Sequence, residues 1–150
     1  MKFVKNTVIF LFAITFLTSL SGCRLIKYSY PFTQDVADVI SVEICRYDFY
    51  DKLVTPIIEL EKDKATSLLE DISELDCYMR FGDGTRDYGR VVIYITYKNG
   101  EAEVIGKSNR ARVDAKGEWW IEPYYFDKAE WSALILKYVD EELVPELRQG

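Results

Sequence analysis

The side chains that most enzymes use for catalysis are unevenly represented in this sequence. Its 150 residues include 25 Asp and Glu residues and three cysteines, but no histidine. Without histidine, the chain forms neither a Ser-His-Asp nor a Cys-His nucleophilic site, and zinc has no imidazole ligand. The sequence also has no G-x-x-x-x-G-K-[ST] loop and no G-x-G-x-x-G motif at a helix start. We therefore expect no cofactor and no enzymatic activity of these kinds.

Carboxylates are the remaining candidates for catalysis. Four of them lie on or beside expected strands: Glu43, Glu59, Glu118 and Glu122. Two carboxylates that converge in a cleft support glycoside hydrolysis, because one donates a proton while the other acts as base or nucleophile. The spacing selects no pair, so solvated charge on a sheet surface is the favoured interpretation. An envelope hydrolase is kept as the alternative to a non-enzymatic protein.

A stretch rich in glycine and acidic residues, Gly82–Asp87, offers oxygen ligands of the kind that Ca²⁺ binds. It lacks the spacing of an EF-hand loop, and Arg86 lies within it. Glycine and aspartate are also the usual residues of a tight turn. We expect a turn here and no metal site.

The stretch Trp119–Phe126 is unusually rich in aromatic residues. Because neighbouring residues of a strand point to opposite faces, Trp119 and Trp120 do not both belong to a one-sided core. We expect one of them to lie on the outer face with Glu122 and Tyr124, in an interface or a sugar-stacking surface. The alternative is that both are covered, one by a helix and the other by the N-terminal segment or a loop.

Basic residues gather in the middle of a chain that is acidic overall. They are Arg80, Arg86, Arg90, Lys107, Arg110 and Arg112. Carried on adjacent strands, they would form a positive patch for an anionic partner. The alternative is pairing with acidic residues of neighbouring strands, namely Glu101, Glu103 and Asp114. The candidate partner-binding residues are therefore Trp119, Trp120, Tyr124, Arg80, Arg90, Arg110 and Arg112.

Two segments have the apolar spacing of amphipathic helices. The first spans about 63–75, with Asp63 as the expected N-cap. The second spans about 128–143, where Asp127 and Glu130 form a capping box and Pro145 ends the helix.

The other periodic segments indicate strands. They are residues 39–47, 53–60, 76–81, 90–97, 102–107, 110–113 and 119–124. Asn99-Gly100 predicts a two-residue hairpin loop of type I′ between two of these strands. The order of elements shows no βαβ alternation, which argues against a parallel sheet. We expect an α+β fold with a single, mostly antiparallel sheet and both helices packed on one face.

The N-terminus has the three parts of a secretory signal. Lys2 and Lys5 precede an apolar run from Val8 to Leu20, and Leu20-Ser21-Gly22-Cys23 follows. This motif resembles the lipobox of bacterial lipoproteins. The resemblance implies cleavage before Cys23, diacylglyceryl modification of its sulfur and attachment to the extracytoplasmic face of a membrane. The apolar run is shorter than the about 20 residues that a spanning helix needs.

This resemblance divides the chain into a signal peptide over 1–22, a lipidated N-terminus and tether over 23–38, and a single domain over 39–150. Without the two signal lysines, 17 basic residues face 25 acidic ones, a formal charge of −8. Such a charge argues against nucleic acid as a partner. In an exported protein, Cys45 and Cys77 form an even pair that suits a disulfide; two buried free thiols are the alternative.

The strand Val91–Tyr97, the Lys98-Asn99-Gly100 turn and the segment Tyr124–Asp127 resemble small uncharacterised lipoproteins of bacteria. That resemblance implies no activity and no site residues. The sequence therefore predicts a membrane-anchored, extracytoplasmic binding or accessory module that contacts an unknown envelope protein or glycan. An inhibitor or immunity-type lipoprotein is a further alternative.

Overall fold

The computed structural model describes residues 27–48, 53–79 and 89–147, which form an α+β fold. The strands are β1 (Lys27–Ser29), β2 (Val39–Asp48), β3 (Leu53–Glu59), β4 (Asp76–Met79), β5 (Val91–Tyr97), β6 (Ala102–Gly106), β7 (Arg110–Val113), β8 (Trp119–Glu122) and β9 (Tyr124–Phe126). The helices are α2 (Lys62–Glu74) and α3 (Lys128–Tyr138), with short 3₁₀ turns η1 (Val36–Asp38), η2 (Glu141–Leu143) and η3 (Pro145–Leu147). None of the helices in these ranges is long and apolar enough to cross a membrane. Cys23, Arg80 and the stretch Gly82–Asp87 lie outside the described residues.

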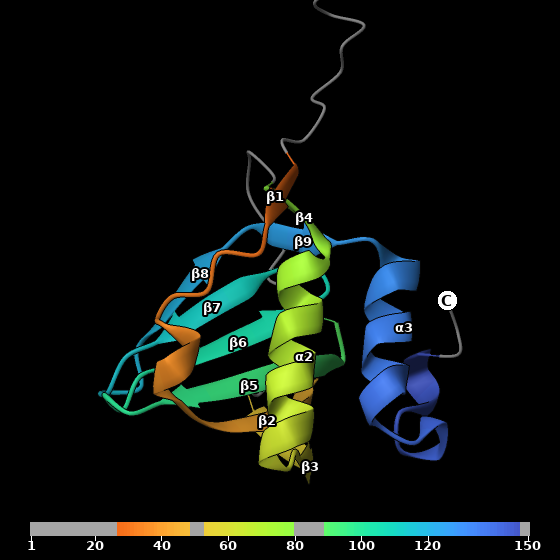
Figure 1. The fold of residues 1–150 in the computed structure, drawn as a ribbon, viewed down its shortest axis with the longest axis horizontal. Helices are drawn as coiled ribbons and strands as arrows, with labels where there is room; N and C mark the ends of the chain where they lie inside the picture. The colour runs from red at the N-terminus through yellow and green to blue at the C-terminus, as the bar shows by residue number, and fades with distance from the viewer. Residues whose placement is uncertain (1–26, 49–52, 80–88, 148–150) are drawn as a thin grey trace, which may run out of the picture.

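The strands form two antiparallel sheets, so the expectation of a single sheet was wrong (Figure 1). The larger sheet has the order β3-β2-β5-β6-β7-β8, and the smaller one has the order β1-β4-β9. Pro123 separates β8 from β9. Proline has no N–H to donate to a ladder, so the chain leaves the large sheet there and pairs with β4 in the small one.

One face of the six-stranded sheet forms the main hydrophobic core together with both helices. Helix α2 buries Leu68, Leu69 and Ile72 in it, and α3 buries Trp131, Leu134 and Ile135. The sheet contributes alternate residues of β2 and β5 to the same core, among them Val42, Ile44, Val91, Ile93 and Ile95. This alternation is what a pleated strand with one face toward the core requires.

The opposite face of the large sheet is also partly buried, in a second cluster of Cys45, Tyr47, Val92, Ala102, Val104, Ala111 and Val113. The rings of Tyr47 on β2 and Trp119 on β8 lie 6.3 Å apart between centroids. Three strands separate β2 from β8, a span of about 19 Å in a flat sheet. The sheet therefore curls toward this face, and the curl lets its own side chains cover one another.

The helix ends differ in part from the predictions. Asp127 is the N-cap of α3, as expected, and its carboxylate accepts hydrogen bonds from the backbone N–H groups of Ala129 and Glu130. Helix α2 begins after Glu61, not after Asp63. Helix α3 ends at Tyr138 instead of 143, because the Asp140 side chain caps a new 3₁₀ turn.

The hairpin between β5 and β6 has a three-residue loop instead of the predicted two-residue loop. The N–H of Tyr97 donates to the carbonyl of Glu101, and the N–H of Gly100 donates to the carbonyl of Tyr97. Gly100 has a φ of 82°. A turn followed by a glycine with positive φ is the usual geometry of three-residue hairpin loops.

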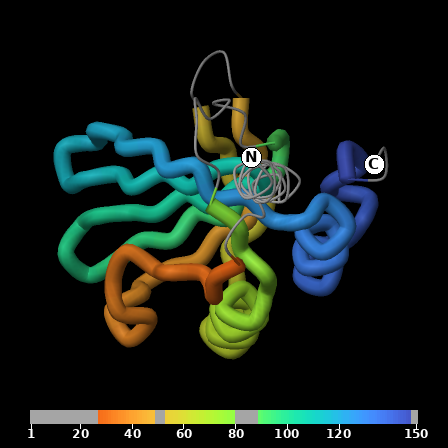
Figure 2. Tube along the Cα trace, turned by 90° about the horizontal axis from the view of Figure 1, so that it is seen from above, coloured from red at the N-terminus to blue at the C-terminus, as the bar shows by residue number. Residues whose placement is uncertain are grey.

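The segment expected to be a tether is part of the fold from Lys27 onward. Strand β1 pairs with β4, placing Lys27 opposite Tyr78. The following residues 30–38, which we call the N-terminal strap, cross the helix-covered face of the large sheet (Figures 1 and 2). Tyr30 is 4% exposed and belongs to the main core. The domain therefore begins before residue 39.

Candidate functional site

The register of β7 and β8 determines where the two adjacent tryptophans lie. Arg112 is paired with Trp120, and Val113 is paired with Trp119. Because side chains alternate along a strand, Trp120 shares a face with Arg112 and Glu122, while Trp119 points to the opposite face. There Trp119 packs against the second cluster, next to Tyr47. Trp120 is 50% exposed and is the accessible member of the pair.

Trp120 lies in a groove of about 300 Å³, which we call the Trp120 groove. Its lining residues are Glu101, Arg112, Val113, Asp114, Trp120 and Glu122. An exposed indole with a guanidinium and three carboxylates around it combines a flat apolar surface with several hydrogen-bonding groups. Ligand sites commonly have this composition, in which the apolar part supplies contact area and the polar groups fix orientation.

The carboxylates of the groove are held in place by hydrogen bonds. Asp114 accepts bonds of 2.9 Å and 2.8 Å from the backbone N–H groups of Lys116 and Glu118. Glu101 accepts a bond of 2.7 Å from the Gln34 side chain, which belongs to the N-terminal strap. These contacts fix side chains that would otherwise have to be ordered when a ligand binds, so they lower the entropy cost of binding.

Arg110 is buried, so it does not contribute to the positive surface patch that the sequence suggested. It instead pairs with acidic residues of neighbouring strands, which was the alternative. Its side chain is 7% exposed, and its Nε donates a bond of 2.7 Å to Glu122 on β8. The guanidinium also donates to the carbonyl of Pro31 and lies 4.4 Å from the centroid of the Tyr124 ring. Arg110 and Tyr124 therefore hold the strap and the two sheets together.

A fully buried carboxylate, Glu103 on β6, lies beside Arg110. One of its oxygens is 3.6 Å from an Arg110 nitrogen. It accepts hydrogen bonds from the hydroxyl groups of Tyr97, at 2.7 Å, and Tyr30, and from both the N–H and the hydroxyl of Thr33, at 3.0 Å. Burial raises the pKa of the Tyr30 and Tyr97 hydroxyls, and the nearby Glu103 charge adds to this effect.

The other predicted site residues are dispersed. The structure brings Trp120 and Arg112 together in one groove, whereas Arg90 is exposed and lines a different cavity. Glu43 and Glu59 are directly opposed in the register of β2 and β3. Glu122 is the one member of the predicted carboxylate set that lines the Trp120 groove.

Cys45 and Cys77 are free thiols, so the disulfide that the even count allowed is not formed. The physical reason is that Cys77 lies in the main core, whereas Cys45 belongs to the cluster on the opposite face of the large sheet. Burial raises the pKa of both thiols to about 12. Both cysteines therefore pack as small apolar side chains and have little thiolate character at neutral pH.

Within the three described ranges, no group of at least three Cys, Asp or Glu side chains is arranged to hold a metal ion. Comparison of the chain with models of protein families, with curated proteins and with solved structures finds no match. The function is therefore inferred from the geometry of the site and from the N-terminal motif.

Proposed function

We propose that this protein is a non-enzymatic binding module of a bacterial cell envelope, anchored to the extracytoplasmic face of a membrane through lipid on Cys23. The lipobox-like motif supports the anchor, and the Trp120 groove supports the binding activity. The observation that carries the proposal is a tryptophan 50% exposed on a sheet strand, flanked by a guanidinium and three carboxylates. Tryptophan and arginine are enriched among residues that dominate binding energy.

The charges of the groove favour a neutral, hydroxyl-rich ligand. Glu122 is paired with Arg110. The two remaining carboxylates of the groove still outnumber the single Arg112 guanidinium, so an anionic ligand is disfavoured. A sugar ring offers an apolar face to the indole of Trp120 and hydroxyl groups to both signs of charge. We therefore propose an envelope glycan as the ligand, with a polar segment of an envelope protein as the other outcome of a binding test.

Replacing Trp120 by alanine is expected to weaken glycan binding by about tenfold or more, because truncating a central aromatic anchor costs at least about 2 kcal/mol. The stability should change by less than about 1 kcal/mol, since the side chain is largely solvated. The measurement is retention of the full-length chain, in a polyoxyethylene detergent, on insoluble envelope glycan, together with urea unfolding.

The matched control is Trp119→Ala, which removes the same side chain one position away, on the opposite face, where it packs against the second cluster. It should lower stability by about 1–3 kcal/mol and leave the retention of the folded fraction unchanged. Equal retention of Trp120→Ala and the unchanged protein would contradict the glycan proposal. Retention of envelope proteins alone would identify the ligand as protein.

Replacing Cys23 by alanine is expected to abolish incorporation of a fatty-acid analogue, because the thiolate sulfur is the atom that the lipid would modify. Cys45→Ala is the matched control, since that thiol is buried in the fold. Label should remain on Cys45→Ala and disappear from Cys23→Ala. Persistence of label on the Cys23 variant would rule out the lipobox assignment without bearing on the groove.

An envelope hydrolase is the second candidate, because three carboxylates lie in the Trp120 groove. In a hydrolase, Glu122→Gln or Asp114→Asn would abolish release of soluble fragments from envelope glycan while leaving retention intact. Binding without fragment release supports the non-enzymatic proposal.

A further inference from the structure

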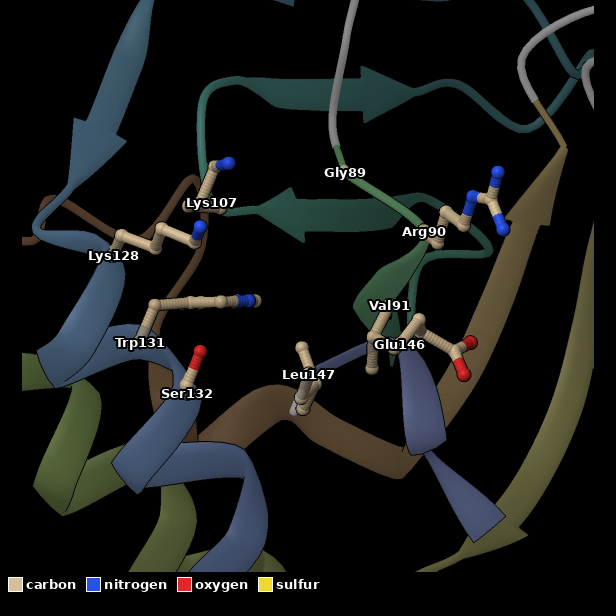
Figure 3. A pocket seen from close by; sticks show the side chains of 9 residues that line it. All are labelled: Gly89, Arg90, Val91, Lys107, Lys128, Trp131, Ser132, Glu146 and Leu147. Carbon is tan, nitrogen blue, oxygen red and sulfur yellow. The ribbon is translucent and has the colours of Figure 1, made fainter. Parts of the chain in front are cut away.

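A second cavity, of about 360 Å³, lies where the start of α3 approaches the large sheet (Figure 3). We call it the basic pocket. Its lining residues are Gly89, Arg90, Val91, Lys107, Lys128, Trp131, Ser132, Glu146 and Leu147. Three side chains are cationic and one is anionic, although the chain as a whole has a net charge of −6. The pocket is therefore a local reversal of charge.

The single carboxylate does not neutralise the two lysines. Glu146 is bound to Arg46, with 3.0 Å between Oε1 and Nε. Figure 3 shows Arg90 and Glu146 directed away from the lysines, whereas the amines of Lys107 and Lys128 lie on the same side of the pocket, beside Trp131. Across the described ranges, no ion pair joins either lysine to a carboxylate.

Backbone contacts hold the two lysines near each other. The N–H of Phe126 donates a bond of 2.8 Å to the carbonyl of Lys107, which ties the turn after β6 to strand β9. Lys128 follows Phe126 by two residues and is the first residue of α3. Two ammonium groups carried by neighbouring backbone segments repel each other, and an anion between them would offset that repulsion.

The rest of the lining offers one neutral donor and an apolar wall. Ser132 supplies a hydroxyl on the first turn and a half of α3, next to Trp131. Trp131 is 1% exposed and stacks on Phe126 at 5.2 Å between ring centroids, so it is a rigid part of the wall. Val91 and Leu147 extend the apolar surface on the other side.

We propose that the basic pocket binds the phosphate group of a phosphate ester, with Lys107 and Lys128 as its charged contacts and Ser132 as a neutral donor. A phosphate has three or more acceptor oxygens and therefore suits donors that approach from separate elements. The organic part of the ester then lies against Trp131 and Leu147. This site is independent of the Trp120 groove, whose excess of carboxylates disfavours such an anion.

Calorimetric titration of the full-length chain in a polyoxyethylene detergent tests the proposal, with inorganic phosphate and glycerol phosphate as the probes. Lys107→Gln and Lys128→Gln should each weaken binding by about tenfold, the loss expected when a charge-assisted contact is removed. Lys64→Gln is the matched control, because Lys64 is exposed on α2 and its substitution makes the same charge change. Glycerol phosphate should bind more tightly than inorganic phosphate, since it also contacts the apolar wall.

A second arm distinguishes the sources of the phosphate. The chain is placed in phosphatidylcholine vesicles with or without phosphatidylglycerol. Suppression of glycerol phosphate binding by phosphatidylglycerol would identify a lipid headgroup, and unchanged binding would identify a soluble ester; both support a phosphate site. Equal weakening by Lys64→Gln and the two pocket variants, or no heat of binding in the unchanged protein, would overturn the proposal. Trp120→Ala should leave phosphate binding unchanged, so the phosphate proposal and the glycan proposal are tested independently of each other.

Discussion

Replacing Trp131 by alanine is expected to lower the free energy of unfolding by about 3–5 kcal/mol, because both apolar transfer and the cavity left behind contribute. The side chain is 1% exposed and stacks on Phe126. It therefore joins α3 to the small sheet through β9 as well as to the main core. The loss is a large part of the about 5–15 kcal/mol that stabilises a typical domain. Urea unfolding followed by circular dichroism measures it.

Leu136→Ala is the matched control on the same helix. Leu136 is 36% exposed, so its truncation should cost less than about 1 kcal/mol. If the urea midpoints of the two variants fall equally, Trp131 does not have the core role that its burial indicates. A Trp131→Ala variant that is already unfolded without urea also agrees with the expectation, provided that Leu136→Ala folds. The control then shows that α3 tolerates the truncation of a side chain.

Several features that depend on local pattern were predicted well from the sequence, although the Asp63 N-cap and the two-residue hairpin loop were not. The segment Val91–Tyr97 is β-branched or aromatic throughout, and the structure contains the strand predicted over 90–97 with its start one residue later, at Val91. The N-cap at Asp127 depends only on a carboxylate that reaches the N–H groups of the next turn. Such features need no knowledge of the rest of the chain, since the interacting groups are neighbours in sequence.

Features that depend on pairing between distant segments were not predictable. Alternation places Trp119 and Trp120 on opposite faces, but only the curl that brings Tyr47 against Trp119 decides which one is covered. The even number of cysteines allowed a disulfide or two buried free thiols. In the structure Cys77, on β4 of the small sheet, packs in the main core, whereas Cys45 lies in the cluster on the other face of the large sheet. Composition gives the number of cysteines, but it does not show on which side of the sheet each thiol lies.

The buried cluster around Glu103 also depends on contacts between distant segments, so the sequence alone did not predict it. From the sequence, Glu103 was one of three acidic residues that could pair with basic residues of neighbouring strands. The alternating pattern of β6 does place Glu103 on the same face as Ile105, which belongs to the main core. A charged residue at such a position indicates a buried partner. The pattern does not show that the partners come from the strap, more than 60 residues away.

Replacing Glu103 by alanine is expected to cost about 3–5 kcal/mol of stability, the range for removing one partner from a buried ion pair. The carboxylate is fully buried and accepts from Tyr30, Tyr97 and Thr33 as well as facing Arg110. Without it, these donors lose their acceptor in a dry environment. Glu101→Ala, on the same hairpin but partly solvated, should cost less than about 1 kcal/mol.

The role of this carboxylate in attaching the N-terminal strap can be measured separately from its effect on the core. Tyr30→Phe removes only the hydroxyl that donates to Glu103, so the Tyr30/Glu103 double-mutant cycle should give a coupling energy of about 1.5–3 kcal/mol, typical of hydrogen bonds to charged groups. Tyr138→Phe is the control for loss of a tyrosine hydroxyl, because its partner is Asp71 and not Glu103. A Tyr30/Glu103 coupling near zero would mean that ring packing alone holds the strap. A clear coupling would mean that a buried charge, in addition to ring packing, fixes the N-terminal strap to the domain.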